Sequence, residues 1–237
     1  MHHYGVIGYP LEHSFSALLF NRKFAAEKID AEFTLYPVAP EEQAQIPALI
    51  ARLDGLTVTS PYKETVIPYL ERLDETAAAI GAVNVIYQGT GYNTDYIGFM
   101  NSLRPLLRTW DKNALVLGTG GAAKAVSYGL QQLGISPTLV SRHPKAGMTG
   151  YGDLTEEMMD SHTIIVNCTP LGMLPNVDSC PAIPYERITA RHLLYDCVYN
   201  PEETVFLRKG KAQGAVIRNG AEMLLGQAEA AWQIWKP

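Results

Sequence analysis

A glycine-rich turn in the second half of the chain has the composition of a phosphate-binding site. It follows the apolar run 114–117, opens a helical pattern, and consists of Gly118, Thr119, Gly120, Gly121 and Ala122. The first glycine permits a tight turn, and the second lets backbone amides approach a pyrophosphate at the positive end of the helix. Placed between a strand and a helix, the turn predicts a dinucleotide site; the alternative is a glycine-rich turn that binds nothing.

The end of the next strand indicates which dinucleotide is bound. In an NAD site this strand ends in Asp or Glu, which binds the 2′-hydroxyl of the ribose. Here residues 138–140 are followed by Ser141 and Arg142, without an acid. Because a planar guanidinium pairs well with phosphate, the cofactor is predicted to be NADP. The alternative is an Arg142 that merely faces solvent.

The elements around this turn alternate between strand and helix. Apolar runs at 114–118, 137–142, 163–167 and 192–196 predict strands, and residues 120–134 predict the helix between the first two. This alternation is typical of a doubly wound parallel sheet. We therefore predict an NADP-binding, Rossmann-like domain at 99–219.

The first half also predicts an α/β arrangement. Strands are expected at 5–8, 32–38 and 55–61, and a hairpin begins at 84–88. Ser14 or Ser16 is expected to cap the helix after the first strand. A helix at 96–107 links the halves, and a long helical pattern at 220–235 is expected to pack back on the first half. We predict a substrate-binding domain at 1–98, completed by the C-terminal helix 220–237, with a cleft between the two domains.

Composition limits the kinds of partner. The 237 residues fit two domains, and the net charge of −5 gives no general attraction to nucleic acid or anionic membranes. The N-terminus does not resemble a signal peptide, and no apolar stretch is long enough to span a bilayer. Cys168, Cys180 and Cys197 offer neither a disulfide framework nor a zinc motif. We expect a cytoplasmic, metal-free enzyme that binds small molecules and is a monomer or homodimer.

Seven segments, in order, resemble the motifs of the shikimate dehydrogenase family. The matches run from residue 5 to about residue 230. The segments are the serine motif Gly8 to Ser16, the lysine motif Val58 to Lys63, the asparagine and aspartate motifs Gly81 to Asn84 and Gly91 to Asp95, and the C-terminal set Asn167 to Met173, Tyr199 to Pro201 and Asn219 to Gln227. Seven matches in order are very hard to obtain by chance.

The resemblance implies an NADP-dependent oxidoreductase that reduces 3-dehydroshikimate to shikimate, a step of chorismate and aromatic amino acid biosynthesis. It implies Lys63 and Asp95 at the reaction centre. The implied substrate contacts are Ser14 and Ser16 to the carboxylate, Thr59, Asn84 and Gln227 to the ring hydroxyls, and Tyr199 near the carboxylate and the cofactor. Further cofactor contacts are implied for Thr169, Cys197 and Gly220, and Glu75 matches a position sometimes given that role.

The chemistry of these residue types agrees with the resemblance. A polyhydroxylated acid needs many short side chains that both donate and accept hydrogen bonds, as Ser, Thr, Asn and Gln do. The nicotinamide carries the hydride, so the protein must supply a proton to the oxygen that becomes a hydroxyl. A lysine beside a carboxylate can both position the substrate and transfer that proton.

The sequence departs from the family pattern at four positions. Thr57 stands where Asn is usual, Val85 where Thr is usual, Ala17 where Pro is usual, and Ser141 where Asn is usual. The chain is also shorter than most members. Two alternatives stay open: a quinate/shikimate dehydrogenase that uses NAD, against which Arg142 argues, and a catalytically silent module that senses pathway ligands, against which Lys63 and Asp95 argue.

Overall fold

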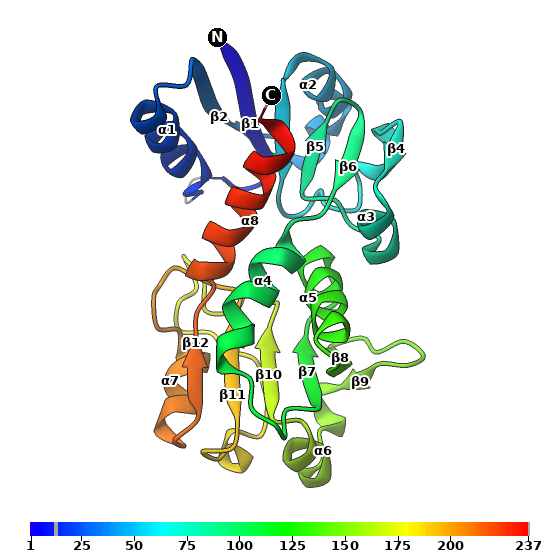
Figure 1. The fold of residues 1–237 in the computed structure, drawn as a ribbon. Helices are drawn as coiled ribbons and strands as arrows, with labels where there is room; N and C mark the ends of the chain where they lie inside the picture. Colours follow the sequence, from blue (N-terminus) through cyan, green and yellow to red (C-terminus); the bar gives the residue numbers. More distant parts are fainter. Residues whose placement is uncertain (12–13, 237) are drawn as a thin grey trace. The chain divides into compact units, whose positions relative to one another are not determined.

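The computed structural model describes residues 1–11 and 14–236, so Glu12 and His13 of the serine motif lie outside the described residues. The chain divides into two compact units. Unit 1 comprises Met1–Thr94 with Ala228–Pro237, and unit 2 comprises Asp95–Gln227. Each unit has its own six-stranded sheet, called sheet A in unit 1 and sheet B in unit 2 (Figure 1). The predicted fold class, two α/β parts, is confirmed.

Sheet A is mixed. Its strand order is β2 (Ala31–Pro37), β1 (His2–Gly8), β3 (Gly55–Val58), β5 (Val85–Tyr87), β6 (Thr90–Tyr92) and β4 (Arg72–Leu73). Strand β1 pairs in parallel with β2 and β3, whereas β5 is antiparallel to β3 and to β6. The predicted hairpin is therefore confirmed as β5–β6. Its turn residues Gln88 and Gly89 have φ of 47° and 70°, the left-handed backbone that a two-residue hairpin turn requires.

Helices cover both faces of sheet A. They are α1 (Ser16–Glu27), α2 (Ile46–Arg52) and α3 (Glu75–Ile80), with short 3-10 helices at η1 (Pro40–Gln45) and η2 (Ile67–Tyr69). The core beside α1 includes the end of α8 (Ala221–Trp235), and the other core includes residues of α2 and α3. Trp235 stacks on Tyr4 with ring centroids 5.1 Å apart, and its indole N–H donates to the Ile86 carbonyl. The end of the C-terminal helix thus packs into unit 1, whereas the part of the helix up to Gln227 belongs to unit 2.

The start of α1 differs from the prediction. The residue before its first turn is Phe15, with φ of −84° and ψ of −7°, and it makes no side-chain cap. Neither Ser14 nor Ser16 occupies the capping position, so the prediction of a serine cap was wrong.

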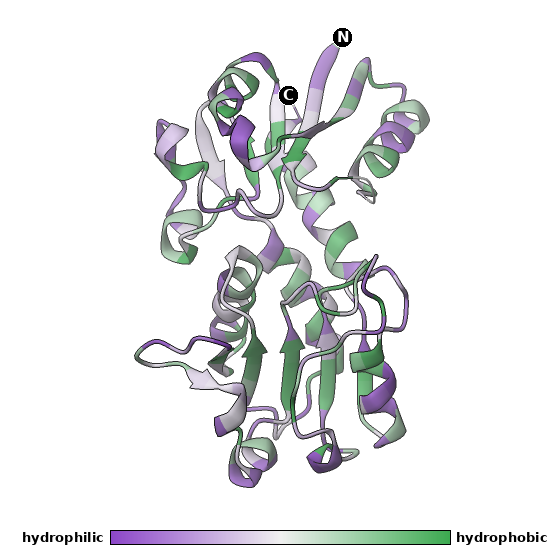
Figure 2. Ribbon diagram, turned by 180° about the vertical axis from the view of Figure 1, so that it is seen from behind, coloured by the Kyte–Doolittle hydropathy of each residue, from purple (hydrophilic) through white to green (hydrophobic). Residues whose placement is uncertain are grey.

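Sheet B is entirely parallel. Its order is β12 (Val216–Arg218), β11 (Leu193–Asp196), β10 (Ile164–Asn167), β7 (Asn113–Leu117), β8 (Ser136–Ser141) and β9 (Thr149–Gly150). Within sheet B the chain runs from the central strand β7 outward through β8 to β9. It then returns to β10 on the other side of β7 and continues outward to β12, which is the Rossmann order. Its central strands are almost entirely buried, and their residues are hydrophobic except for polar residues at the strand ends (Figure 2). The prediction of a doubly wound parallel sheet is confirmed.

Helices also cover both faces of sheet B. The core on one face joins the sheet to α4 (Asp95–Leu103), α5 (Gly121–Gln132) and the start of α8, and the core on the other face joins it to α6 (Glu156–Ser161) and α7 (Val205–Ala212). The remaining 3-10 helices are η3 (Arg104–Leu106), η4 (Tyr151–Asp153) and η5 (Tyr185–Arg187). The helix expected at 96–107 stops at Leu103, because Pro105 has no N–H to continue it. No helix within residues 1–11 and 14–236 is long and apolar enough to cross a membrane.

Candidate functional site

Three of the predicted site residues lie at one edge of sheet A. At this edge β1 and β3 end and β5 begins. The backbone N–H of Thr59 donates to the Ile7 carbonyl, with N and O 2.9 Å apart. The Asn84 carbonyl accepts from the N–H of Val58, and the Lys63 carbonyl accepts from the N–H of Val83. Backbone pairing therefore holds Thr59, Lys63 and Asn84 around the same strand ends.

The Asn84 side chain binds the segment that leads to Asp95. Asn84 is only 2% exposed. Its amide N–H donates to the Thr94 hydroxyl at 3.0 Å, and its amide oxygen accepts from the Thr94 backbone N–H at 2.6 Å. The amide thereby fixes the residue immediately before Asp95. Sequence reasoning missed Thr94, although both partners lie in the quoted asparagine and aspartate motifs.

The other two predicted substrate residues of unit 1 lie between β1 and α1. Ser14 follows the strand end, and its backbone N–H donates to the Leu11 carbonyl. Ser16 is the first residue of α1. Both are half-buried. Because the cap position belongs to Phe15, the helix start does not explain why two hydroxyls stand here.

Asp95 and Gln227 occupy neighbouring parts of two crossing helices in unit 2. Helices α4 and α8 touch backbone to backbone, since a Cβ added to Gly98 would lie 2.3 Å from the Met223 carbonyl oxygen and 2.7 Å from the Gln227 nitrogen. A Cβ on Gly226 would lie 2.9 Å from the Gly98 Cα. Asp95 begins α4 one turn before Gly98, and Gln227 directly follows Gly226. This glycine crossing was also missed; isolated glycines inside helical patterns were its signal.

Two of the departures from the family pattern have side chains that are buried inside unit 1. The Thr57 hydroxyl donates to the Gly5 carbonyl within the sheet, and Thr57 is 6% exposed. Val85 is fully buried in the core beside α1. The Thr57 hydroxyl is therefore committed to a hydrogen bond with the neighbouring strand, and the Val85 side chain is committed to packing in the core.

The glycine turn lies at the carboxyl edge of sheet B, where β7 ends. Gly118 has φ of +114°, a backbone that side chains rarely adopt, and its N–H donates to the Val140 carbonyl. Gly120 precedes the first turn of α5, and a Cβ there would meet nothing within 4 Å. Ala123 is fully buried against the sheet and supplies the third small residue of the dinucleotide pattern, which sequence reasoning did not identify.

The end of β8 presents Arg142 to solvent. The Ser141 hydroxyl accepts from the backbone N–H of His143 at 3.1 Å and so shapes the turn that carries the guanidinium. A dinucleotide with a 2′-phosphate needs hydrogen-bond donors at both of its phosphate groups. The open glycine turn and the 12-residue helix that starts there fit the pyrophosphate, and the exposed guanidinium after the adjacent strand fits the 2′-phosphate.

The remaining residues predicted to lie near the cofactor follow β10 and β11 or immediately precede α8, with one exception. The Thr169 hydroxyl donates to the Asn167 amide oxygen at 2.6 Å. Gly220 packs on Cys197, because a Cβ on Gly220 would lie 2.3 Å from the Cys197 carbonyl oxygen. Tyr199 lies in the segment after β11 and is half-buried. The exception is Glu75, which is exposed at the first residue of α3 in unit 1.

A buried polar network ties the ends of β10 and β11 together. The Asn167 amide N–H donates to the Asp196 carboxylate at 3.0 Å, and the Thr204 hydroxyl donates to the same carboxylate at 2.6 Å. The Val198 backbone N–H also donates to it at 3.0 Å. Asp196 is fully buried, and burial raises its pKa from 3.8 to about 6, although these three donors act in the opposite direction. Sequence reasoning identified neither Asp196 nor Thr204.

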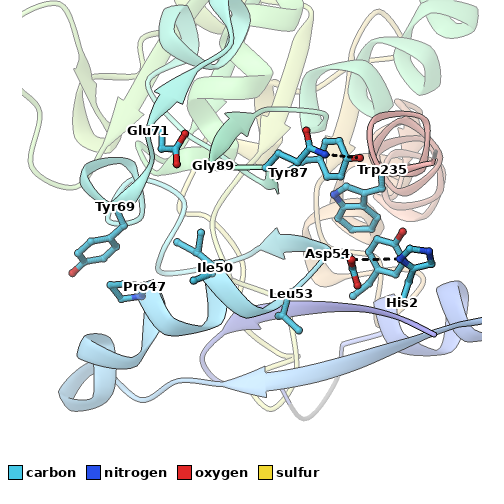
Figure 3. A pocket seen from close by; sticks show the side chains of 13 residues that line it. His2, Pro47, Ile50, Leu53, Asp54, Tyr69, Glu71, Tyr87, Gly89 and Trp235 are labelled. Carbon is cyan, nitrogen blue, oxygen red and sulfur yellow. Dashed lines mark hydrogen bonds and ion pairs between the residues drawn. The ribbon is translucent and has the colours of Figure 1, made fainter.

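A separate cavity of about 680 Å³ lies at the opposite edge of sheet A (Figure 3). His2 at the start of β1, Asp54 before β3, Gly89 in the β5–β6 turn and Trp235 line it. The His2 ring nitrogen lies 3.4 Å from the Asp54 carboxylate. None of the predicted site residues lines this cavity, so it is not the predicted substrate site.

Comparisons with known proteins point to one family. A family model for the substrate-binding domain of shikimate dehydrogenase matches residues 6–86. The shikimate dehydrogenase (NADP(+)) of Methanosphaera stadtmanae is 35% identical over 98% of this chain and 90% of its own length. The shikimate dehydrogenase structure from Aquifex aeolicus gives a TM-score of 0.89 at 34% identity, covering 100% of this chain and 92% of the other. The shikimate dehydrogenase structure from Thermus thermophilus, in complex with NADP(H) and shikimate, gives a TM-score of 0.88 at 28% identity and covers 100% of this chain and 94% of the other.

The buried carboxyl of Asp196 predicts a pH-dependent stability. Its folded pKa of about 6 lies above the ordinary 3.8, so its contribution is most favourable below 3.8 and is lost as the pH rises through about 6. A shift of this size corresponds to roughly 3 kcal/mol. Asp196→Asn keeps the hydrogen-bonding shape without the charge. We expect the free energy of unfolding of the Asp196→Asn variant, measured with urea, to increase relative to that of the native protein as the pH rises from 3.8 to about 6. A difference that stays constant with pH would contradict the prediction.

Proposed function

The chain belongs to the shikimate dehydrogenase family of NADP-dependent oxidoreductases, and we propose that it reduces 3-dehydroshikimate to shikimate. One observation carries the proposal for the site. Thr59, Lys63 and Asn84 lie at one edge of sheet A, and Asn84 binds the residue that precedes Asp95. A lysine, a carboxylate and several short hydrogen-bonding side chains are the groups that reduction of a hydroxylated cyclic ketone needs.

Lys63 is the proposed proton donor. NADPH, which the glycine turn and Arg142 would hold, would supply the hydride that the carbonyl carbon of the substrate receives. Negative charge then develops on the carbonyl oxygen, and the Lys63 ammonium stabilises that charge and donates a proton to the oxygen. Asp95 accepts a hydrogen bond from a ring hydroxyl and orients the lysine. Serine, threonine and asparagine cannot replace Lys63, because their protons are far too weakly acidic.

The remaining substrate residues divide by the part of the substrate that they bind. The hydroxyls of Ser14 and Ser16 bind the carboxylate, and Tyr199 lies near it. Thr59, Asn84 and Gln227 bind ring hydroxyls together with Lys63 and Asp95. The Asn84 amide already holds Thr94 through its oxygen and one N–H.

The cofactor residues have equally distinct roles. The backbone of Gly118, Thr119, Gly120, Gly121 and Ala122, at the start of α5, binds the pyrophosphate. Ser141 and Arg142 bind the 2′-phosphate, and Thr169, Cys197 and Gly220 lie beside the nicotinamide. The positive φ of Gly118 and the open space at Gly120 support this assignment.

The proposed reaction is tested by following NADPH absorbance with shikimate and NADP as substrates, with parallel assays on quinate and on NAD. We expect turnover of shikimate with NADP and much lower kcat/KM for either replacement. Absence of turnover with every pair would show a binding module, and preference for quinate with NAD would show the other dehydrogenase activity.

Arg142 is expected to determine the choice of cofactor. Arg142→Ala should weaken NADP binding roughly tenfold or more while changing NAD binding little, since a hydrogen bond to a charged group contributes about 1.5–3 kcal/mol. Titration calorimetry with both cofactors measures the effect. Lys145→Ala, which removes an exposed cation from the same loop, is the matched control. If the native protein bound the two cofactors equally, the assignment of Arg142 would be wrong.

The effects of changing Lys63 and Asp95 on catalysis are expected to be coupled. Lys63→Ala should lower kcat by roughly 10²–10⁴, the range typical of lost acid–base catalysis, with a modest change in shikimate affinity. Asp95→Asn should lower both kcat and affinity, and the double variant should be less impaired than the product of the two effects. Steady-state kinetics and calorimetry measure these quantities, with the exposed Lys112→Ala as control. Near-native kcat in Lys63→Ala would show that the proton comes from another group.

A further inference from the structure

Two cysteines stand side by side where β10 and β11 end. The last register pair of these parallel strands is Asn167 with Asp196, so Cys168 and Cys197 are the next residues along each strand. The Cys197 backbone N–H donates to the Asn167 carbonyl at 2.9 Å and extends the pairing by one residue. The two sulfur atoms lie 3.7 Å apart.

Both side chains lie on the same face of sheet B. Side chains alternate along a strand, and Cys168 and Cys197 follow Val166 and Tyr195 by two residues. All four contribute to the core that faces α4 and α5. Neighbouring strands are about 4.8 Å apart, within the roughly 4.4–6.8 Å that a disulfide allows between Cα atoms. The sulfurs therefore need only approach to bonding distance, about 2.05 Å, while the strands keep their register.

The surroundings favour a bond between these two thiols over other cysteine chemistry. The network of Asn167 and Asp196 fixes the two strand ends next to each other. Both cysteines are half-buried and not sealed in the core. In the described part of the chain, no cluster of three or more His, Cys, Asp or Glu could hold a metal. Cys180 packs with the core on the opposite face of the sheet.

We propose that Cys168 and Cys197 form a reversible intramolecular disulfide when the protein meets a peroxide. One thiolate attacks a peroxide oxygen, the O–O bond breaks, and a sulfenic acid and water form. The second thiolate attacks the sulfenic sulfur, the S–S bond forms, and a second water leaves. Two thiols and one hydrogen peroxide thus give one disulfide and two waters, and a dithiol reductant reverses the step.

The disulfide would alter the proposed cofactor edge. The Cys168 carbonyl oxygen lies 3.3 Å from the position of a Cβ on Gly118, and the Cys197 carbonyl oxygen lies only 2.3 Å from the position of a Cβ on Gly220. Drawing the sulfurs together shifts both backbones that support these glycines. Oxidised protein should therefore bind NADP several-fold more weakly, an expectation that rests on the proposed function.

The test is mass spectrometry of the native protein after treatment with equimolar hydrogen peroxide under non-reducing conditions. We expect loss of the mass of two hydrogen atoms and a proteolytic fragment that joins the peptides containing Cys168 and Cys197. Dithiothreitol should restore both. Cys180→Ala should behave like the native protein, whereas Cys168→Ala and Cys168→Ser should not form the cross-linked fragment.

Several outcomes would overturn the proposal: no loss of hydrogen mass, a disulfide through Cys180, a bond between two chains, or oxidation to sulfinic acid without cross-linking. NADP binding is measured by calorimetry on reduced and oxidised protein. If reduced protein failed to bind NADP while the disulfide formed, the cofactor proposal would fail and the disulfide would stand. Equal NADP affinity in both states would remove the proposed effect on the cofactor.

Discussion

Parallel pairing of strands is the constraint on which both halves of the proposed site depend. Strands that run in the same direction end at the same edge, and the chain must turn there with residues that are not committed to the sheet. In sheet A this edge collects Thr59 and Lys63 after β3, next to Asn84. In sheet B it collects the glycine turn after β7 and Arg142 after β8. Residues far apart in the sequence thereby become neighbours within each unit.

Sequence patterns predicted those residues that lie at strand ends. The apolar runs at 114–117 and 192–196 were recognisable as strands, and the glycine turn and Arg142 were found because they follow such runs directly. The resemblance to the family, now confirmed, supplied Lys63 and Asp95. The serine cap of α1 was wrong because capping depends on where the first helical turn starts, and that position shifted by a residue onto Phe15.

Residues that act through tertiary contacts could not be predicted in the same way. Gly98 and Gly226 matter because two helices separated by more than a hundred residues cross there, and no local pattern states which helices meet. Thr94 matters because Asn84 binds it, and Thr204 because Asp196 is buried beside it. Likewise, the departures at Thr57 and Val85 could not be placed in the core before the strand register was known.

Asp196 fixes the geometry of the edge of sheet B although its buried charge lowers the stability of the fold. A fully buried carboxyl whose pKa is raised by burial opposes folding when it is charged, so its three hydrogen bonds do not compensate for lost solvation. The carboxylate instead fixes the backbone geometry, because it binds Asn167 at the end of β10 and also Val198 and Thr204 in the segment after β11. The backbone around Cys168 and Cys197 is fixed in this way. Because Gly118 and Gly220 pack on that backbone, the buried charge helps to define the edge at which the cofactor is proposed to bind.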